Sequence, residues 1–110
     1  MTPFAPNKKE LGLTQADLEN IVAVVRQCPE VEEAIIFGSR AKGNYTPGSD
    51  VDIALKGAEV SHATTSRISY HLNQETQMPY HFDVLDYKTV TNTDLRNHVD
   101  RVGVSFYKQH

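Results

Sequence analysis

Three aspartates and a glycine–serine pair are the residues of this sequence best suited to do chemistry. Gly38-Ser39 is followed, after ten residues, by Asp50-Val51-Asp52, and Asp83 lies further along the chain. Aspartates at positions i and i+2 of a strand lie on one face and can converge on one divalent cation. Such hard oxygen ligands select Mg²⁺ or Mn²⁺ over zinc. We therefore expect Asp50 and Asp52 to bind a metal ion.

The Gly38-Ser39 pair is suited to bind an anion. At the end of a strand and the start of a helical turn, such a pair lets backbone N–H groups approach an anion without a Cβ in the way, and the dipole of the turn favours negative charge. Arg40 and Lys42 add positive side chains beside the pair. The expected phosphate site would then adjoin the expected metal site.

Asp83 would complete a cluster of three carboxylates if an adjacent strand places it on the same face. Two ionised carboxylates 4 Å apart repel by about 1 kcal/mol in bulk water and by about 4 kcal/mol at an effective dielectric constant of 20. We expect a cation or a bound proton to offset this repulsion. A purely structural cluster would be an odd choice.

Each feature also has an ordinary structural explanation. A Gly-Ser pair is common in turns, the Asp-x-Asp sequence could solvate the start of a strand, and Arg40 and Lys42 could be surface charges. Asp83 could pair with a lysine. Asp86 could be the functional acid of that strand, although the alternation places it on the opposite face. The combination of features favours a functional site.

The histidines give a weaker signal. His81 shares the predicted face of Asp83 and could line the cleft. The remaining four have no spacing typical of metal ligands and are interpreted mostly as surface residues: His62, His71, His98 and His110.

The first half of the chain predicts a helix, a strand and a loop that position the glycine. Thr14 and Asp17 are spaced as a capping box, and apolar residues then recur on one helical face. Pro29 ends this helix, and the β-branched and aromatic run 31–37 predicts a buried strand. The polar stretch 40–49 predicts at most one helical turn followed by a loop.

The second half predicts the elements that carry the aspartates. The run 50–55 alternates Asp50, Asp52 and Ala54 with aliphatic residues, which predicts a strand with the carboxylates on one face. A weakly amphipathic helix is expected over about 61–74 and a third strand over 80–86.

The end of the chain completes an α+β domain. A helix is expected over 91–102, ending with Gly103 in the left-handed conformation, and a short strand over 104–107 closes the fold. Together the elements predict a small mixed β-sheet with helices packed on one side. Residues 1–12 are expected to form a flexible polar arm, and residues 13–110 a single domain.

Length and composition restrict the function. The 110 residues carry 11 Lys and Arg against 14 Asp and Glu, a formal charge of −3, so we expect one small acidic domain and a minimal enzyme. The acidic balance argues against broad binding of a nucleic-acid backbone. No apolar run is long enough to span a membrane. The single cysteine, Cys28, excludes an internal disulfide and fits a packing residue in a cytoplasmic protein.

The combination of Gly38-Ser39, the ten-residue spacer, Asp50-Val51-Asp52-Ile53 and Asp83 resembles the signature of the DNA polymerase β-type nucleotidyltransferase superfamily. Within it, the chain is most similar to the minimal nucleotidyltransferases, small proteins often encoded beside a helical HEPN-type partner. The resemblance extends from the first helix to the closing Val-Ser-Phe-Tyr. Members commonly read Gly-Ser-Arg-Ala-Arg-Gly. Here Lys42 replaces the second arginine, which keeps the charge but loses the planar fork.

The resemblance implies a polymerase β-like fold and the transfer of a nucleoside monophosphate, with AMP expected, from a nucleoside triphosphate to a hydroxyl group. Two Mg²⁺ ions, or Mn²⁺, would assist as pyrophosphate leaves. By similarity, Asp50 and Asp52 would bridge both ions, and Asp83 would complete the ion that activates the acceptor. Gly38 and Ser39 would hold the triphosphate of ATP, with Arg40 and Lys42 neutralising its outer charge.

Larger relatives use an additional helical domain to hold the base and the acceptor, and a chain of this length has no residues left for one. We therefore expect a HEPN-type helical partner, as in pairs where the nucleotidyltransferase acts as an antitoxin by adenylylating a partner tyrosine. Homodimerisation is a second way to close the site. An RNA end is a less favoured acceptor, and an antibiotic-modifying transferase would need a larger acceptor lobe.

A different class of function also fits the sequence. The chain could be a non-catalytic subunit that binds a nucleotide and a metal and scaffolds a helical partner. The presence of all three aspartates favours catalysis, since binding alone would tolerate the loss of one.

Overall fold

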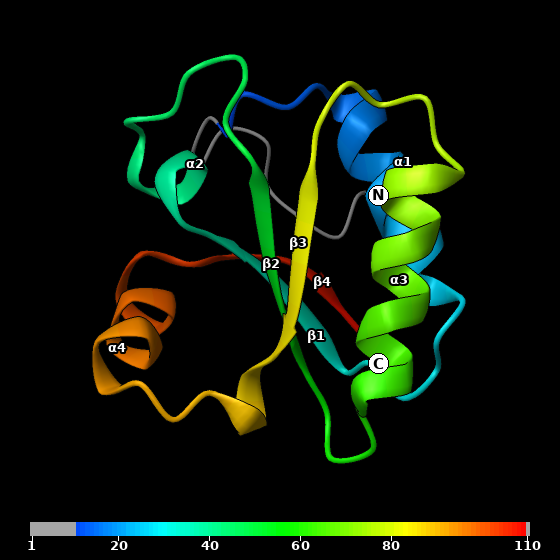
Figure 1. Ribbon diagram of the computed structural model, residues 1–110, viewed down its shortest axis with the longest axis vertical. Coiled ribbons are helices and arrows are strands. Elements are labelled where there is room, and N and C mark those ends of the chain that lie inside the picture. Colours follow the sequence, from blue (N-terminus) through cyan, green and yellow to red (C-terminus); the bar gives the residue numbers. More distant parts are fainter. Residues whose placement is uncertain (1–10, 110) are drawn as a thin grey trace.

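Figure 1 shows the fold of the chain in a computed structural model, which describes residues 11–109. A four-stranded sheet separates helices on its two faces, and the expected α+β class is confirmed. In chain order the elements are α1 (Gln15–Arg26), β1 (Glu33–Phe37), α2 (Ser39–Lys42), β2 (Val51–Lys56), α3 (His62–Gln74), β3 (Phe82–Asp86), the 3₁₀ turn η1 (Tyr87–Thr89), α4 (Thr93–Val102) and β4 (Val104–Lys108).

The sheet is mixed, as expected, with the strand order β3-β2-β1-β4. The central strand β1 pairs antiparallel with both β2 and β4, whereas β2 pairs parallel with β3. A parallel pair needs a crossover connection, and α3 supplies it between β2 and β3. As a result, β2 and β3 begin at the same end of the sheet at which β1 ends.

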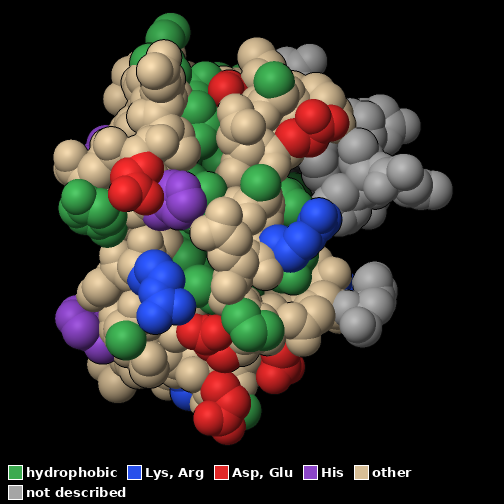
Figure 2. Space-filling model, turned by 90° about the vertical axis from the view of Figure 1, so that its right-hand side faces the viewer, with side chains coloured by type: hydrophobic (Ala, Val, Ile, Leu, Met, Phe, Trp, Pro, Cys, Tyr) green, Lys and Arg blue, Asp and Glu red, His purple; other side chains and the backbone are tan. Residues whose placement is uncertain are grey.

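The main core lies between the sheet and helices α1 and α3, on the right in Figure 1. Val51, Ile53 and Leu55 of β2 are all 0% exposed and face this core, which confirms the alternation read from the sequence. Burial of one such aliphatic side chain contributes about 1.5–3 kcal/mol. Figure 2 shows the outer surface of this side, where acidic and basic side chains are scattered among polar groups.

Helix α4 lies on the opposite face of the sheet, which differs from the expectation of helices on one side only. Its buried Val99 packs against Ile35, Phe37 and Ala54. These side chains make the second face of the central strands apolar as well. A strand that is apolar on both faces needs cover on both, and α4 provides the second cover.

Local sequence signals set the helix starts. Thr14 Oγ1 accepts a hydrogen bond from the Asp17 N–H at 3.0 Å, and Asp17 Oδ2 accepts one from the Thr14 N–H at 3.1 Å, so the predicted capping box is confirmed. Asp17 also accepts a hydrogen bond from the Tyr80 hydroxyl at 2.8 Å. A second capping box, Ser61 with Thr64, begins α3.

The packed part of the chain includes residues that the sequence assigns to the N-terminal arm. Leu11 is 5% exposed and belongs to the main core. The rest of the predicted arm, residues 1–10, lies outside the described residues. Cys28 is buried, as expected for a packing residue. Among residues 11–109, no helix has the length and apolarity needed to cross a membrane.

Gly103 is not in the left-handed conformation that the sequence suggested. Its φ of −60° and ψ of 145° are extended values that other residues adopt. A Cβ at this position would lie 2.4 Å from the carbonyl oxygen of Val99 and 2.6 Å from Cγ2 of Ile35. Glycine is therefore needed here for close packing of α4 against β1, and not for backbone freedom.

We predict that Gly103→Ala lowers the free energy of unfolding by about 1–3 kcal/mol, because the new methyl group overpacks the contact between α4 and β1. Urea denaturation measures this change. Gly48→Ala is the matched control, since a Cβ there meets no atom within 4 Å. Equal stability of the two variants would contradict the packing role of Gly103.

Candidate active site

The register of the sheet brings two of the three aspartates side by side. Asp52 of β2 pairs with Phe37 of β1 on one side and with Asp83 of β3 on the other. Directly paired residues on neighbouring strands point to the same face of a sheet. Asp52 and Asp83 therefore share the face that α4 partly covers. Asp50 is exposed and lies just before β2, two residues from Asp52.

The glycine turn contacts the central carboxylate. Gly38 follows Phe37 at the end of β1 and has a φ of 78°, which L side chains rarely adopt. A Cβ on Gly38 would lie only 2.2 Å from Oδ2 of Asp52. The expected adjacency of the turn and the carboxylates is thus present, and a side chain at position 38 would displace Asp52.

The electrostatics of the site disfavour a charge on Asp52. Partial burial raises the pKa of Asp52, and the carboxylates of Asp83 and then Asp50 raise it further, while His81 opposes the rise. Because the charges of Asp83 and Asp50 both act on Asp52, all three aspartates belong to one electrostatic unit. The effect on Asp52 also places His81 at the site, as its predicted face suggested.

The three carboxylates do not form a closed metal cage. Within residues 11–109, no three His, Cys, Asp or Glu side chains are placed to hold one ion together. Mg²⁺ at nucleotide sites is usually bound by one or two carboxylates, with water and substrate phosphates completing its shell. Asp50, Asp52 and Asp83 fit this kind of open site.

Ser39 and Lys42, two of the residues expected at the phosphate, have polar groups that a ligand can reach. Ser39 is half-buried, and among the described residues neither its N–H nor its hydroxyl has a hydrogen-bond partner. Lys42 is exposed on α2.

Arg40 is placed differently from the expected phosphate contact. It is 1% exposed, and its guanidinium donates to the carbonyl oxygens of Leu11 at 3.0 Å and Ser49 at 2.9 Å, with longer bonds to two further carbonyls. The rings of Tyr45 and Tyr80 lie 5.4 and 5.0 Å from its central carbon. These contacts favour a structural role for Arg40, which ties the loop before Asp50 to the body of the protein.

Asp86, the alternative acid of β3, has a structural environment. Its side chain is buried, accepts hydrogen bonds from the Lys88 side chain at 2.9 Å and the Lys88 N–H at 3.2 Å, and begins η1. Lys88 also donates to the carbonyl of Val60. Lys88 is therefore bound to Asp86, and Asp83, for which the sequence left a lysine partner open, is exposed.

Two residues at the site were missed from the sequence. Asn73 of α3 accepts from the Phe82 N–H at 2.8 Å and donates to the Phe82 carbonyl at 2.9 Å, which fixes the start of β3 next to Asp83. His98 of α4 accepts a hydrogen bond from the Gly38 N–H at 2.8 Å. The available signal for His98 was its place three residues after Leu95, on the apolar side of the helix.

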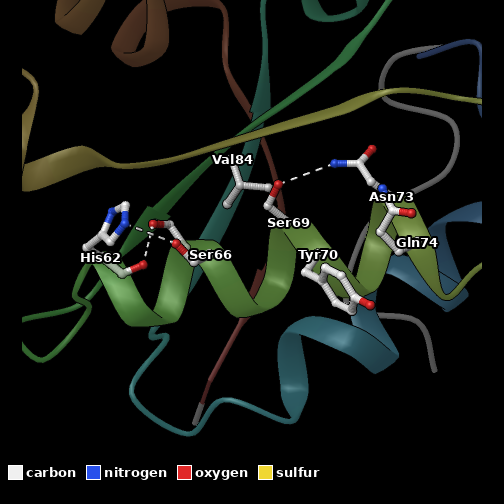
Figure 3. Close-up of a pocket in the computed structure, with 8 residues that line it drawn as sticks. His62, Ser66, Ser69, Tyr70, Asn73, Gln74 and Val84 are labelled. Carbon is white, nitrogen blue, oxygen red and sulfur yellow. Dashed lines mark hydrogen bonds between the residues drawn. The ribbon is translucent and has the colours of Figure 1, made fainter.

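A separate groove runs between α3 and β3 on the other face of the sheet. It encloses about 470 Å³, and Figure 3 shows that polar side chains of α3 line most of it, with Val84 contributed by β3. Tyr70 projects beside it and is 62% exposed. Because Val84 alternates with Asp83 along β3, the sheet separates this groove from the carboxylates.

Comparison with known proteins settles the family. The family described as "Polymerase beta, Nucleotidyltransferase" matches residues 19–110 of the chain. The chain belongs to this nucleotidyltransferase family. The expected polymerase β-like fold is thereby confirmed. A search of curated proteins finds no match.

Solved structures share the nucleotidyltransferase fold. A chain in a crystal structure of a toxin–antitoxin with AMP-PNP superposes with a TM-score of 0.70 and 21% identity, covering 86% of this chain and 75% of that one. A chain in a crystal structure of the toxin–antitoxin MntA–HepT superposes with a TM-score of 0.66 and 19% identity, covering 87% of this chain and 74% of that one. A putative nucleotidyltransferase from Sulfolobus solfataricus superposes with a TM-score of 0.52 and 27% identity, covering 84% of this chain and 77% of that one.

We predict that Arg40→Lys lowers the free energy of unfolding of this nucleotidyltransferase by about 2–4 kcal/mol, because one ammonium group cannot serve the carbonyls that the guanidinium binds. Chemical denaturation of the metal-free protein measures it. Arg26→Lys, at an exposed position near the end of α1, is the control and should change stability by less than about 0.5 kcal/mol. An unaffected Arg40→Lys would show that these contacts contribute little.

We predict that Asp52→Asn stabilises the metal-free nucleotidyltransferase at neutral pH, raising Tm by about 1–4 °C. The raised pKa of Asp52 means that the folded state binds more protons than the unfolded state, so wild-type stability falls as pH rises from the usual aspartate value past the raised one. The variant lacks this loss. Thermal unfolding in EDTA from pH 3 to pH 8 measures the difference, with Glu59→Gln as an exposed control. A lower Tm for Asp52→Asn at pH 7 would contradict the assignment.

Proposed function

We propose that this chain transfers a nucleoside monophosphate, AMP from ATP in the first instance, to a hydroxyl group of a partner protein. The observation that carries the proposal is the contact of the Gly38 turn with Asp52, since it sets the turn that we expect to bind phosphate directly against oxygens that we expect to bind metal. Membership of the nucleotidyltransferase family supports the same reaction class.

The residues divide the work between metal and phosphate. Asp50 and Asp52 would hold Mg²⁺ together with the phosphates of the nucleotide, and Asp83 would hold the ion on the acceptor side. When bound, two such ions would supply positive charge to stabilise the attacking and leaving oxygens of an in-line displacement at phosphorus. Ser39 would donate its N–H and hydroxyl to the triphosphate, and Lys42 would offset part of its charge.

The reaction itself is a substitution at the α-phosphorus of the triphosphate. The acceptor hydroxyl loses its proton to solvent, and its oxygen forms a new bond to the α-phosphorus. The bond from the α-phosphorus to the oxygen that bridges it to the β-phosphorus breaks, and pyrophosphate leaves with that electron pair. The unfavourable charge on Asp52 supports a cation-dependent role, because carboxylates with a raised pKa beside other carboxylates are typical of functional positions.

We further propose that the acceptor belongs to a HEPN-type helical protein and that the chain is the antitoxin half of a two-protein system. The basis is its fold likeness to chains of toxin–antitoxin structures, one of which contains AMP-PNP. Asp50 and Asp83 are exposed, so a macromolecular acceptor could reach them. Closure of the site by a second copy of this chain is the competing arrangement.

We predict that the chain, incubated with its helical partner, radiolabelled ATP and Mg²⁺, labels the partner, and that Asp50→Asn and Asp83→Asn each reduce the rate at least about 100-fold because charge stabilisation in the transition state is lost. Asp94→Asn, an exposed substitution on α4, is the control and should keep the wild-type rate. Label transfer is measured by gel autoradiography.

The outcomes separate the candidate functions. Asp83→Asn should keep most of the nucleotide affinity, whereas equal loss of binding and transfer would contradict its acceptor-side role. Transfer that survives Asp50→Asn would remove Asp50 from the metal site. Tight MgATP binding by the wild type without any transfer would favour the non-catalytic scaffold over the enzyme.

A further inference from the structure

Helix α4 contacts the glycine turn through the side chain of His98. The Gly38 N–H donates a hydrogen bond of 2.8 Å to Nε2 of His98, a residue 60 positions away in the sequence. The His98 ring also meets Phe37 edge-on, with centroids 6.0 Å apart and planes at 77°. His98 therefore holds both residues at the point where β1 turns into the site.

This contact requires one protonation state. Nε2 can accept a hydrogen bond only when the imidazole is neutral and its proton is on Nδ1. Burial lowers the pKa of His98, and the positive charges of Lys42 on α2 and Arg101 on α4 lower it further. Phe37, the ring contact from β1, carries no charge. The surroundings thus favour the neutral acceptor form.

The contact also assigns a role to the Gly38 amide. Because its N–H is already bound to His98, it is engaged within the protein and not directed to a phosphate. The orientation of the Gly38 peptide sets the position of the Ser39 N–H, which follows it in the turn. The same residue lies against Oδ2 of Asp52, so a shift of Gly38 would disturb both the phosphate-binding and the metal-binding groups.

We propose that His98 is a positioning residue that holds the Gly38 turn in its phosphate-binding shape by accepting the Gly38 N–H. This inference rests on the proposed nucleotide-binding function of the turn. Removal of the acceptor, by substitution or by protonation of the ring, loosens the turn and weakens binding of the triphosphate beside Asp52. A protonated imidazole has an N–H at both nitrogens, and two donors would then face each other at Gly38.

The sign of the pH effect follows from the lowered pKa. The support from His98 is complete above the usual histidine pKa and is lost as the pH falls through the lowered value. Protonation of the site carboxylates in acid also weakens Mg²⁺ binding. This effect is the same in wild type and in every variant at position 98. The informative quantity is therefore the difference between wild type and a variant with a non-titrating acceptor.

The experiment compares His98→Gln, which offers an amide oxygen as acceptor without titrating, with His98→Leu, which offers none. MgATP affinity of the full chain is measured by calorimetry between pH 5 and pH 8. At pH 7.5 we expect His98→Leu to bind about 3- to 10-fold more weakly than wild type, the effect of one hydrogen bond, and His98→Gln to bind within about 2-fold. Between pH 7.5 and pH 5, wild type should lose more affinity than His98→Gln.

A second measurement tests the contact without nucleotide. The amide shift of Gly38, followed by NMR in the apo chain, should titrate together with the His98 ring and become pH-independent in His98→Gln. His71→Gln is the matched control, since His71 lies on α3, away from Gly38, and its Nε2 is 3.6 Å from Oε1 of Glu75. It should leave both the Gly38 shift and the MgATP affinity unchanged.

Two results would overturn the inference: a Gly38 shift that ignores the ionisation of His98, or a folded His98→Leu variant with wild-type MgATP affinity. Thermal unfolding of each variant identifies loss of fold. If wild type binds no MgATP at any pH, the proposed function fails, and the Gly38 titration still decides whether His98 holds the turn.

Discussion

The close approach of the Gly38 turn to Asp52 is the contact on which the site depends. Antiparallel pairing of β1 with β2 places Asp52 opposite the last residue of β1, so the chain must turn away directly above a carboxylate. Only a residue without a side chain fits there, because a Cβ would overlap Oδ2 of Asp52. Ser39, which we propose binds the triphosphate, follows Gly38 directly in the chain.

This arrangement brings three negatively charged side chains together, and their repulsion lowers the stability of the folded state. Asp52 is partly buried and next to two other carboxylates, so its ionised form is disfavoured in the folded state. A cation that binds together with the ligand would offset the repulsion between these carboxylates. The open geometry, without a preformed cage in the described residues, fits an ion that arrives with a nucleotide.

Polar side chains behind the site hold it in place. Arg40 binds carbonyls of the loop that leads to Asp50, Asn73 clamps the start of β3, and His98 accepts from the Gly38 amide. Each anchor comes from a different helix and binds backbone groups instead of a ligand. Fixed backbone is what a site built at strand ends requires, since the ends themselves lack the full hydrogen-bond ladder of a strand interior.

The sequence by itself determined the features that depend on local spacing. The capping box at Thr14 follows from the spacing of two capping residues, and the Gly38-Ser39 turn from the types of its residues. The alternation along 50–55 placed the carboxylates on one face of a strand. The boundaries of the elements were less exact. Strand β3 begins at Phe82, two residues after the expected start at Tyr80, because pairing with β2 and not composition sets where the strand begins.

Only the tertiary structure decided the contacts between residues far apart in the chain. It turned Arg40 inward, placed α4 on the second face of the sheet, and brought His98 to Gly38 across 60 positions. It also gave Gly103 its role through the packing of α4 on Ile35. Local periodicity carries no information on which distant donor meets which acceptor, since that pairing follows from the packing of the whole core.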